Sequence, residues 1–424
     1  MEEWKEYKLG DCVEAVIDNR GKSTPTKPLG EFPLLEINSI GGYYPNYSVI
    51  RKYVDKVTYN TWFRSGHPIC GDILIPTVGT IGIISIMDNH KACIAQNLIA
   101  LRTKKEISNI FIYYFLKSPI VKKQLINLDI GGVQPSIKVP HLLNLSISLP
   151  EKDIQHKIAS ILSSLDDKIE LNRKINANLE AQAQALFKSW FVDFEPFKDQ
   201  PFVESELGMI PEGWKVGRYD EIIDSTISGD WGKEKPEGNY THKVACIRGC
   251  DFQDIKNGLR GKTPERYILE KNFQTKHFRD KDILVEISGG TATVSTGRVC
   301  PVSQLLIDKF NEDIVCTNFC RLVRPKPNYG AFLYYSWLYK YDNKVMFGYE
   351  NGTSGIKNFR IKDFTALEPV VIPSEDALMA FQIVIDKLQM KLQMNGSESQ
   401  KLASLRDALL PRLMSGELKV NEVI

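Results

Sequence analysis

Apolar residues recur at helical spacing in two long stretches of the chain. In both stretches the apolar positions lie three or four residues apart, or at sums of these steps, as in a helix that packs along another helix. Each stretch follows a proline, Pro150 or Pro373, and has acidic residues in what would be its first turn. The pattern predicts two long helices, within 151–194 and 374–424, and Pro411 is expected to end or kink the second.

One polar residue interrupts each stripe at an equivalent place, Asn172 in the first stretch and Asn395 in the second. A single Asn on a coiled-coil seam costs stability but fixes register and partner number. We therefore expect the two helices to pair antiparallel, with these Asn residues near the seam or at the edge of the apolar face. If they lie on the seam, replacing both with Leu is expected to raise the melting temperature. The predicted seam positions are Ile158, Ile161, Leu165, Asn172, Leu179, Phe381, Ile385, Leu388, Asn395 and Leu402.

The remaining sequence has a different pattern. Residues 1–150 and 214–373 contain short β-branched runs that are broken by Gly, Pro and Asn, which is typical of small mixed globules. In the first of these segments, 73–75 and 81–86 are predicted strands around a tight turn, and 109–125 is a predicted helix. Each segment is therefore predicted to form a small α/β globule that precedes a long helix.

The two mixed segments repeat one another. Short matches recur at an offset that drifts from 210 (214 − 4) to 223 (373 − 150), as insertions in loops would cause, and their order never changes. The matches are Trp4-Lys5 with Trp214-Lys215, Asp72-Ile73-Leu74 with Asp282-Ile283-Leu284, Gly79-Thr80 with Gly290-Thr291, Asn97 and Leu101 with Asn318 and Leu322, Tyr113-Tyr114 with Tyr334-Tyr335, Ile137-Lys138 with Ile356-Lys357, and Pro150 with Pro373. Both tyrosine pairs are assigned to core packing on a helix.

This repeat defines the expected fold class and domain order. The fold is α/β, of the α+β kind, with two repeated globules joined by two long helices that form an antiparallel coiled coil in a pseudo-twofold arrangement. The expected domains are a first globule, a central helix, a linker, a second globule, and a distal helix with a C-terminal tail. Their predicted limits are 1–150, 151–194, 195–213, 214–373 and 374–424.

Charge and composition limit what the chain does alone. The 424 residues include 54 Lys and Arg against 52 Asp and Glu, a formal net charge of +2, whereas a non-specific DNA binder is normally much more basic. No stretch approaches the roughly eighteen apolar residues of a membrane span, and the N-terminus lacks the form of a secretory signal. We therefore expect a cytoplasmic protein whose eight cysteines are reduced thiols.

Sequence motifs for catalysis are missing. The chain has no Asn/Asp-Pro-Pro-aromatic tetrapeptide of an adenine methyltransferase and no GxxxxGKS/T phosphate loop, and its six histidines form no ligand pair at helical spacing. The pairs Cys246/Cys250 and Cys316/Cys320 have a spacing that zinc sites use, but parts of both pairs read as buried strand, where cysteine behaves as a small hydrophobe. We predict a chain without catalytic residues, bound metal or cofactor.

Four segments resemble the specificity subunits of type I restriction–modification systems. Residues 165–194, LDDKIELNRKINANLEAQAQALFKSWFVDF, resemble the central conserved region of that family, and 208–214, GMIPEGW, its linker into a second recognition domain. Residues 405–418, LRDALLPRLMSGEL, resemble its distal conserved helix, and 131–150, GGVQPSIKVPHLLNLSISLP, the end of a recognition domain. Together with the repeat, the resemblance covers essentially the whole chain.

The resemblance implies that each globule is a target recognition domain that reads one half of a split site on double-stranded DNA. It implies that the helices set the spacer and dock two modification (methyltransferase) subunits, and that two restriction subunits with motor and nuclease activity complete the assembly. S-adenosylmethionine, ATP and magnesium would then belong to those partners, and this chain would be a non-catalytic specificity subunit. A non-DNA scaffold that joins two binding modules through a coiled coil remains the alternative.

Residue type, loop context and repeat position select candidate DNA contacts in both globules, because base edges are read by polar side chains on exposed loops. An ordinary solvated side chain is the alternative for each. In the first globule the candidates are Arg20, Lys22, Ser23, Asn38, Ser39, Tyr43, Tyr44, Thr77, Thr80, Gln134 and Ser136. In the second they are Trp231, Lys233, Lys235, Arg248, Lys262, Arg266, Ser288, Thr291, Thr353, Ser354 and Lys357. Loops diverge where scaffold matches persist, as in GKSTPTKPLGEF against DWGKEKPEGNYTHK, so we predict an asymmetric target.

Overall fold

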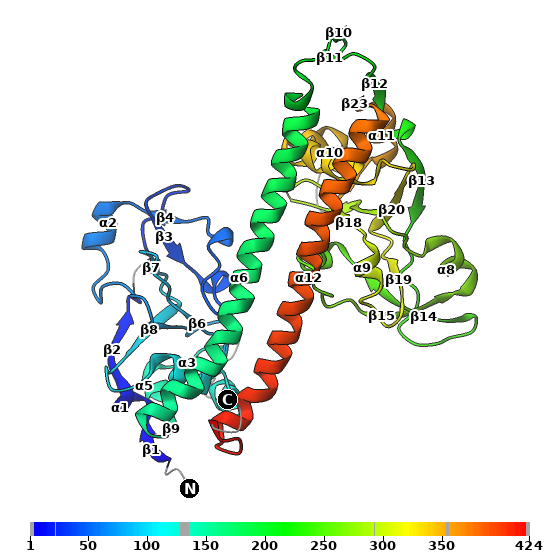
Figure 1. Ribbon diagram of the computed structural model, residues 1–424. Coiled ribbons are helices and arrows are strands. Elements are labelled where there is room, and N and C mark those ends of the chain that lie inside the picture. The colour runs from blue at the N-terminus through cyan, green and yellow to red at the C-terminus, as the bar shows by residue number, and fades with distance from the viewer. Residues whose placement is uncertain (1–3, 22, 128–134, 292, 353–355, 421–424) are drawn as a thin grey trace. The chain divides into compact units, whose positions relative to one another are not determined.

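The computed structural model describes residues 4–21, 23–127, 135–291, 293–352 and 356–420. The chain divides into two compact units, one formed by residues 1–170 with 401–424 (unit 1) and the other by residues 171–400 (unit 2). Both long helices cross from one unit to the other, so each unit contains one globule and one segment of each helix (Figure 1).

Two small sheets form the globule of unit 1. The strands of this globule are β1 (Lys5–Lys8), β2 (Val13–Asp18), β3 (Phe32–Leu35), β4 (Tyr53–Val54), β5 (Ile73–Pro76), β6 (Ser85–Ile86), β7 (Cys93–Ile94), β8 (Leu98–Thr103) and β9 (Ser146–Leu149). The first sheet is antiparallel in the order β2-β8-β5-β6, and the second, in the order β4-β3-β7, pairs β3 with β7 in parallel. A separate pairing joins β1 to β9, directly before the first long helix.

Short helices cover these strands. They are α1 (Leu9–Cys12), η1 (Ile37–Ser39), η2 (Tyr47–Val49), α2 (Lys56–Thr61), α3 (Asn109–Lys117), α4 (Pro119–Asn127) and α5 (Val139–Leu143). The single helix predicted over 109–125 is therefore wrong. Pro119 disfavours the helical conformation in the residue before it, and Ser118 adopts ψ 146°, so α3 ends at Lys117 and a second helix begins. The strand predicted over 81–86 is likewise shorter and forms only at 85–86.

Unit 2 contains the same two sheets. Its strands are β10 (Phe202–Ser205), β11 (Gly208–Pro211), β12 (Lys215–Arg218), β13 (Ile223–Ser228), β14 (Tyr240–Ile247), β15 (Glu265–Leu269), β16 (Ile283–Glu286), β17 (Ser288–Gly289), β18 (Val299–Pro301), β19 (Asp313–Cys316), β20 (Cys320–Pro325), β21 (Glu350–Asn351), β22 (Lys357–Phe359) and β23 (Pro369–Ile372). The orders β13-β20-β16-β18 and β15-β14-β19 and the pair β12-β23 match those of unit 1. Unit 2 also contains a hairpin, β10-β11, and a small sheet, β17-β22-β21.

The helices of this globule are η3 (Glu195–Phe197), η4 (Tyr219–Glu221), η5 (Gly249–Asp251), α7 (Phe252–Lys256), α8 (Glu270–Lys276), α9 (Gln304–Ile307), α10 (Gly330–Asp342), η6 (Val345–Tyr349) and α11 (Ile361–Leu367). Helix α10 takes the place that α3 has in unit 1. The tyrosine pairs on both helices, Tyr113-Tyr114 and Tyr334-Tyr335, are at most 2% exposed, so their assignment to the core is confirmed.

A buried ion pair shows how closely the two globules repeat. In unit 1 the guanidinium of Arg102 donates to Asp72 (2.8 and 3.0 Å), and in unit 2 that of Arg324 donates to Asp282 (2.8 and 2.9 Å). Both aspartates are at most 2% exposed, and each directly precedes an inner strand of its four-stranded sheet, β5 or β16. Because a buried carboxylate needs such a partner, the Asp-Ile-Leu match in the sequence marks a real structural anchor.

Strand register corrects one of the sequence matches. Ile73 pairs with Leu101 in unit 1, and Ile283 pairs with Val323 in unit 2. Leu101 therefore corresponds to Val323, and the match of Leu101 with Leu322 is wrong by one residue. A single-residue slip places a side chain on the opposite face of the sheet, so this difference matters for any comparison between the globules.

A second match needs the same correction. The N–H of Ile137 donates to the C=O of Thr77 (2.8 Å), and the N–H of Phe359 donates to the C=O of Ile287 (2.8 Å). Ile137 therefore corresponds to Phe359, and its match with Ile356 is wrong. The match by letters is therefore off by three residues (359 − 356).

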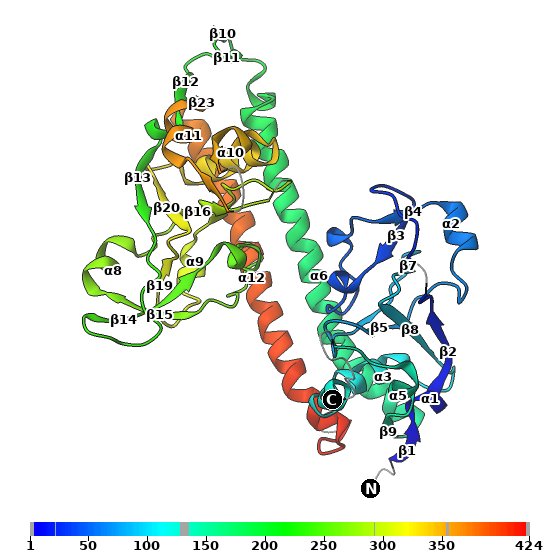
Figure 2. The same ribbon diagram turned by 180° about the vertical axis from the view of Figure 1, so that it is seen from behind.

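The two predicted long helices are confirmed as α6 (Lys152–Phe191) and α12 (Glu375–Met414), each of 40 residues. Within each unit their segments lie side by side and run in opposite directions (Figures 1 and 2). Pro411 lies inside α12, which continues for three residues beyond it, and Gly416 follows with a left-handed φ of 73°. The helix thus ends shortly after the proline, as a C-terminal glycine commonly allows.

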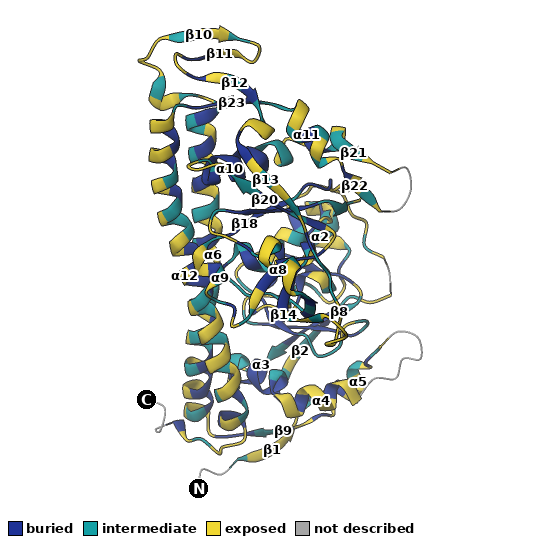
Figure 3. Ribbon diagram, turned by 90° about the vertical axis from the view of Figure 1, so that its right-hand side faces the viewer, coloured by how far each residue is buried: buried dark blue, intermediate teal, exposed yellow. Residues whose placement is uncertain are grey.

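Each unit has one main core that joins its globule to both helix segments. In unit 1 the α3 aromatic residues pack with Leu162 of α6 and Leu413 of α12, and in unit 2 the α10 aromatic residues pack with Phe187 of α6 and Phe381 of α12. Buried residues line the inner faces of the helices and of the strands (Figure 3). The globules are therefore held by apolar burial against the helices.

Candidate nucleic-acid interface

Six candidates of the first globule keep exposed or half-buried side chains: Arg20, Ser23, Asn38, Tyr44, Thr80 and Ser136. Two of them lie near one another, because Ser136 forms a bridge with Val78 and the N–H of Gly79 donates to the C=O of Pro135 (2.8 Å). Thr80 follows in the same turn. The guanidinium of Arg20 donates to Asp18 (2.5–2.9 Å), and this hydrogen bond raises the pKa of Arg20.

Three candidates of this globule are buried, so the prediction that they lie on exposed loops is wrong. Ser39 is 1% exposed and its hydroxyl donates to the C=O of Glu36 (2.6 Å). Tyr43 packs edge-on against the ring of Tyr113, and Thr77 is held in the sheet layer at 1% exposure. Four further candidates lie outside the described residues: Lys22, Gln134, Thr353 and Ser354.

Several loops that carry candidate residues line a cavity of about 380 Å³ in unit 2. It is bounded by the segment after β13, the start of η5, the β16–β17 strands and the turn between β19 and β20. The lining residues are Trp231, Arg248, Gly249, Glu286, Ser288, Thr317, Asn318 and Phe319. Three of these, Trp231, Arg248 and Ser288, are sequence candidates that come from separate parts of the chain. The fold therefore brings part of the predicted set together in one place.

The ring of Trp231 packs against the guanidinium of an arginine, Arg266. The guanidinium carbon of Arg266 lies 3.7 Å from the centroid of the Trp231 ring, a close cation–π contact. Arg266 is only 7% exposed, and its outer nitrogen lies 3.2 Å from the carboxylate of Glu234. The prediction of an exposed side chain is therefore wrong for Arg266, which supports the wall of the cavity from the inside.

Several cations of this face are paired with carboxylates. Arg248 donates to Asp251 (3.0 Å), which raises the pKa of its guanidinium, and also to the C=O of Lys262 (2.8 Å). Lys357 lies 2.8 Å from the carboxylate of Glu350. Exposed side chains are kept by Lys233, Lys235, Lys262 and Thr291. Because part of the positive charge is neutralised within the face, electrostatic attraction for a polyanion is moderate.

Sequence reasoning missed five lining residues: Gly249, Glu286, Thr317, Asn318 and Phe319. Glu286 carries a charge but is 8% exposed and accepts two hydrogen bonds from Arg298 (2.8 Å each). Phe319 is 60% exposed, although an aromatic residue beside a buried strand normally reads as core. The repeat was the sequence signal for this turn: it matched Asn318 with Asn97. Strand pairing aligns Asn97 with Phe319 instead, so this match is wrong by one residue.

The predicted seam residues divide into three groups. Ile158, Phe381 and Ile385 are at most 2% exposed and belong to cores that also contain globule side chains. The half-buried members are Ile161, Leu165, Leu179, Leu388 and Leu402. Asn172 and Asn395 are at most 2% exposed, so they do not lie at the edge of the apolar face.

The two seam asparagines meet within unit 2. The amide of Asn172 donates to the C=O of Asn395 (3.3 Å), and the amide of Asn395 donates to Oδ1 of Asn176 (2.9 Å). Asn176 donates in turn to the C=O of Leu392 (3.2 Å). Sequence analysis missed Asn176, which sits one helical turn after Asn172. The three amides form a polar cluster that fixes the register of the two helix segments in this unit.

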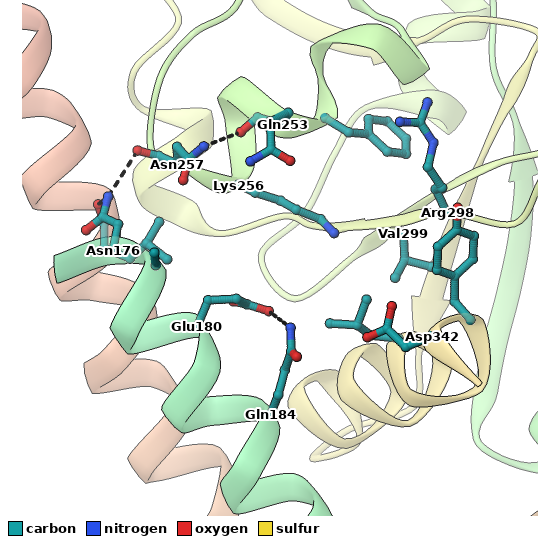
Figure 4. A pocket seen from close by; sticks show the side chains of 14 residues that line it. Asn176, Glu180, Gln184, Gln253, Lys256, Asn257, Arg298, Val299 and Asp342 are labelled. Carbon is teal, nitrogen blue, oxygen red and sulfur yellow. Dashed lines mark hydrogen bonds between the residues drawn. The ribbon is translucent and has the colours of Figure 1, made fainter. Parts of the chain in front are cut away.

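A second cavity of unit 2, of about 430 Å³, lies between α6 and the globule. Figure 4 shows the Lys256 side chain extending into it, with Glu180 and Gln184 on α6 and Asp342 at the end of α10 around it. The amide of Asn176 donates to the C=O of Asn257 across one end (3.4 Å). Acidic and basic side chains line this cavity, and the Asn176–Asn257 hydrogen bond joins the helix to the globule.

Known proteins resemble this chain over nearly its full length. The family described as type I restriction modification DNA specificity domain matches residues 1–181. The type I restriction enzyme MjaIX specificity subunit of Methanocaldococcus jannaschii is 26% identical over 439 residues, with 99% of this chain and 95% of that protein covered. The chain thus resembles the type I restriction specificity subunits over nearly its full length, and residues 1–181 match their DNA specificity domain.

Further specificity subunits agree with this assignment. The type I restriction enzyme HindI specificity subunit of Haemophilus influenzae is 28% identical over 332 residues, with 68% of this chain and 72% of that protein covered. The crystal structure of the type I restriction–modification S subunit from M. genitalium has the same fold, with a TM-score of 0.54 at 17% identity over 97% of this chain and 96% of that one. The resemblance seen in the sequence is thus confirmed, and so is the fold class.

Two further properties follow from the described residues. No helix among them, including the two of 40 residues, is long and apolar enough to cross a membrane. Within the same residues, no three His, Cys, Asp or Glu side chains gather as metal ligands would. Cys246 and Cys316 are buried in strands as expected, and burial raises the pKa of the Cys246 thiol to about 12.

Proposed function

We propose that this chain recognises DNA sequence for a type I restriction–modification enzyme, and that each globule reads one half of an asymmetric, two-part site. The reading heads are the globules within 1–150 and 214–373. The observation that carries this proposal is that the two globules share strand order and pairing register but present different side chains in their loops. Equal scaffolds with unequal loops are what two different half-sites require.

One pair of positions illustrates the difference. Val78 bridges Ser136 in the first globule, whereas Ser288 pairs with Asn358 at the corresponding place in the second, where the two side chains are 2.5 Å apart. A strand edge that carries a valine in one head and a serine in the other offers different groups to a base edge. Side chains of this kind read sequence, while phosphate contacts only position the protein.

The helices supply the spacing in this proposal. A helix of 40 residues is about 60 Å long at 1.5 Å per residue, which exceeds one turn of DNA at about 34–36 Å. The helices also dock two modification subunits, and two restriction subunits complete the enzyme. S-adenosylmethionine, ATP and magnesium act on those partners, and this chain contributes recognition without a catalytic step of its own.

Charge supports a division of labour between the subunits. The chain has a formal net charge of +2, and two cations of the second globule, Arg248 and Lys357, are already paired with carboxylates. Affinity for duplex DNA depends on the number of phosphates that a protein neutralises. We therefore expect weak binding by the isolated chain at physiological salt and strong, sequence-dependent binding once modification subunits add their contacts.

The experiment is a selection with the assembled complex. The chain is purified with the modification subunit encoded beside it and incubated with a library of randomised DNA duplexes, and the modification subunit alone serves as the control. We expect enrichment of two short base clusters that are separated by a constant number of unspecified positions. An intact complex that enriches no sequence contradicts the proposal and favours a scaffold that joins two binding modules without reading DNA.

A further inference from the structure

An exposed aromatic side chain stands at the rim of the cavity in the second globule. Phe319 lies in the turn between β19 and β20 and is 60% exposed, while Thr317 and Cys320 on either side of the turn are buried. A single exposed apolar residue on a protein surface is ordinary. Its position beside Trp231, in a cavity that also gathers Arg248 and Ser288, sets Phe319 apart.

The backbone of this turn is held firmly. The N–H of Phe319 donates to Oγ1 of Thr317 (3.2 Å), and its C=O accepts from the N–H of Ile287 (2.8 Å). The N–H of Cys320 donates to the C=O of Thr317 (2.9 Å). The ring is therefore presented from a fixed attachment point, as a side chain that reads a base must be.

Three charged or polar side chains that line the cavity are already engaged. Arg248 donates to Asp251, Ser288 donates to Asn358, and Glu286 accepts from Arg298. The Trp231 ring is covered on one face by Arg266. What the cavity still offers to a ligand is mainly apolar surface, contributed by the two aromatic rings. Such a site suits an apolar group that projects from a polar partner.

DNA carries one such group on its base edges. In the major groove the four base pairs present donors and acceptors, and the C5 methyl of thymine is the apolar exception. Resting on the proposed function, we propose that Phe319 and the adjoining cavity contact a thymine methyl in the half-site read by the second globule. The half-site then contains a thymine whose recognition depends on its methyl group.

The first globule differs at the same structural position. The C=O of Asn97 accepts from the N–H of Thr77 (2.9 Å), just as the C=O of Phe319 accepts from that of Ile287 (2.8 Å). Asn97 is half-buried. An amide forms hydrogen bonds with an adenine edge, whereas a phenyl ring has only apolar contact to give. The two heads therefore present different side chains at one shared position, which makes the inference specific to the second head.

Deoxyuridine tests this inference, because it removes only the methyl group. The assembled complex is bound to a duplex that carries its selected site, and each thymine of the second half-site is replaced in turn. We expect one position at which the change weakens binding about fourfold, the ratio for one buried carbon group at ~0.8 kcal/mol. In F319A, and in F319N, the same replacement should leave binding unchanged, whereas L305A, at an exposed leucine of the same unit, should keep the fourfold loss.

The outcomes separate this inference from the proposed function. If every thymine is replaceable without loss while the complex still distinguishes its site, the methyl contact is wrong and sequence recognition stands. If F319A lowers affinity for all sequences by one factor and keeps the penalty for deoxyuridine, the ring acts elsewhere and the inference is also wrong. If the complex shows no sequence preference at all, the proposed function itself fails and this inference falls with it.

Discussion

Leucine at Asn172 and leucine at Asn395 should change stability in opposite directions, although the sequence pattern treats the two positions as equivalent. Asn395 donates to Oδ1 of Asn176 (2.9 Å) in a buried site. Asn172 donates to Glu398 (2.8 Å) and Ser399 (3.2 Å), which are exposed or half-buried, and its own Oδ1 is buried without a hydrogen-bond partner among the described residues. The two side chains are therefore not equally satisfied.

The magnitudes follow from these contacts. N395L leaves a buried acceptor on Asn176 without its donor, which costs about 1–3 kcal/mol, and apolar burial of Leu returns part of that. We expect a net loss of about 1–2 kcal/mol in the free energy of unfolding. N172L removes an unpartnered buried oxygen, and water replaces the lost donor at the accessible acceptors, so we expect a change from zero to about 1 kcal/mol of added stability.

Thermal and urea denaturation of the full chain measure this difference. The two variants should differ by about 1–3 kcal/mol in the free energy of unfolding. At about 2–4 °C per kcal/mol for a unit of 230 residues (171–400), this corresponds to roughly 2–12 °C in Tm. N178L, at an exposed position of α6, the helix that carries Asn172, controls for the higher helix propensity of leucine. If both seam variants stabilise the protein equally, the buried amide cluster does not exist as described.

Three further predictions follow from buried and exposed groups. R324A should destabilise the chain by about 3–5 kcal/mol in urea denaturation, because Asp282 is left buried without its cation, and R102A should have a similar effect on unit 1. K262A in the assembled complex should weaken binding to all sequences alike and reduce the salt dependence by about one phosphate contact, whereas a change confined to one base position would contradict that role. Alkylation of the folded chain at pH 8 should modify the exposed Cys70 and Cys250 and spare the buried Cys246, and mass spectrometry identifies the modified residues. Because burial raises the pKa of Cys246 to about 12 in the folded state, the stability that its protonated thiol contributes is lost as the pH rises above the usual value near 9.

The sequence was sufficient for the large-scale organisation because that organisation is periodic. Apolar spacing gives a helix without reference to distant residues, and both long helices begin two residues after the prolines Pro150 and Pro373. The repeat likewise needs only comparison of the chain with itself. These features depend on local pattern, and the structure agrees with them.

Register and exposure depend on contacts between distant segments, and there the sequence was less informative. A match by letters aligned Leu101 with Leu322, whereas strand pairing aligns it with Val323. Ser39 and Thr77 have residue types that are common on loops, but hydrogen bonds to neighbouring backbone hold them inside. Polar residue type alone therefore did not predict which side chains are exposed.

The cavity around Trp231 in the second globule was the hardest part to predict, because several separate segments form it. Trp231, Arg248 and Ser288 were recognised individually, yet their common cavity depends on the pairing of β14, β16 and β20 with their neighbours. Phe319 was missed because an aromatic residue beside a buried strand reads as core until its exposure is known. The proposed recognition site therefore exists only when the fold brings these separate loops together.

The central claim, that one chain reads two separated half-sites, is tested most directly by mapping methylation. The chain is co-expressed with the modification subunit encoded beside it in a host that lacks adenine methylation, and single-molecule sequencing locates the modified bases. The account predicts one asymmetric motif with two specified parts, a constant gap between them, and one modified adenine on each strand. A continuous motif, or no modification despite a stable complex with an active modification subunit, would contradict it.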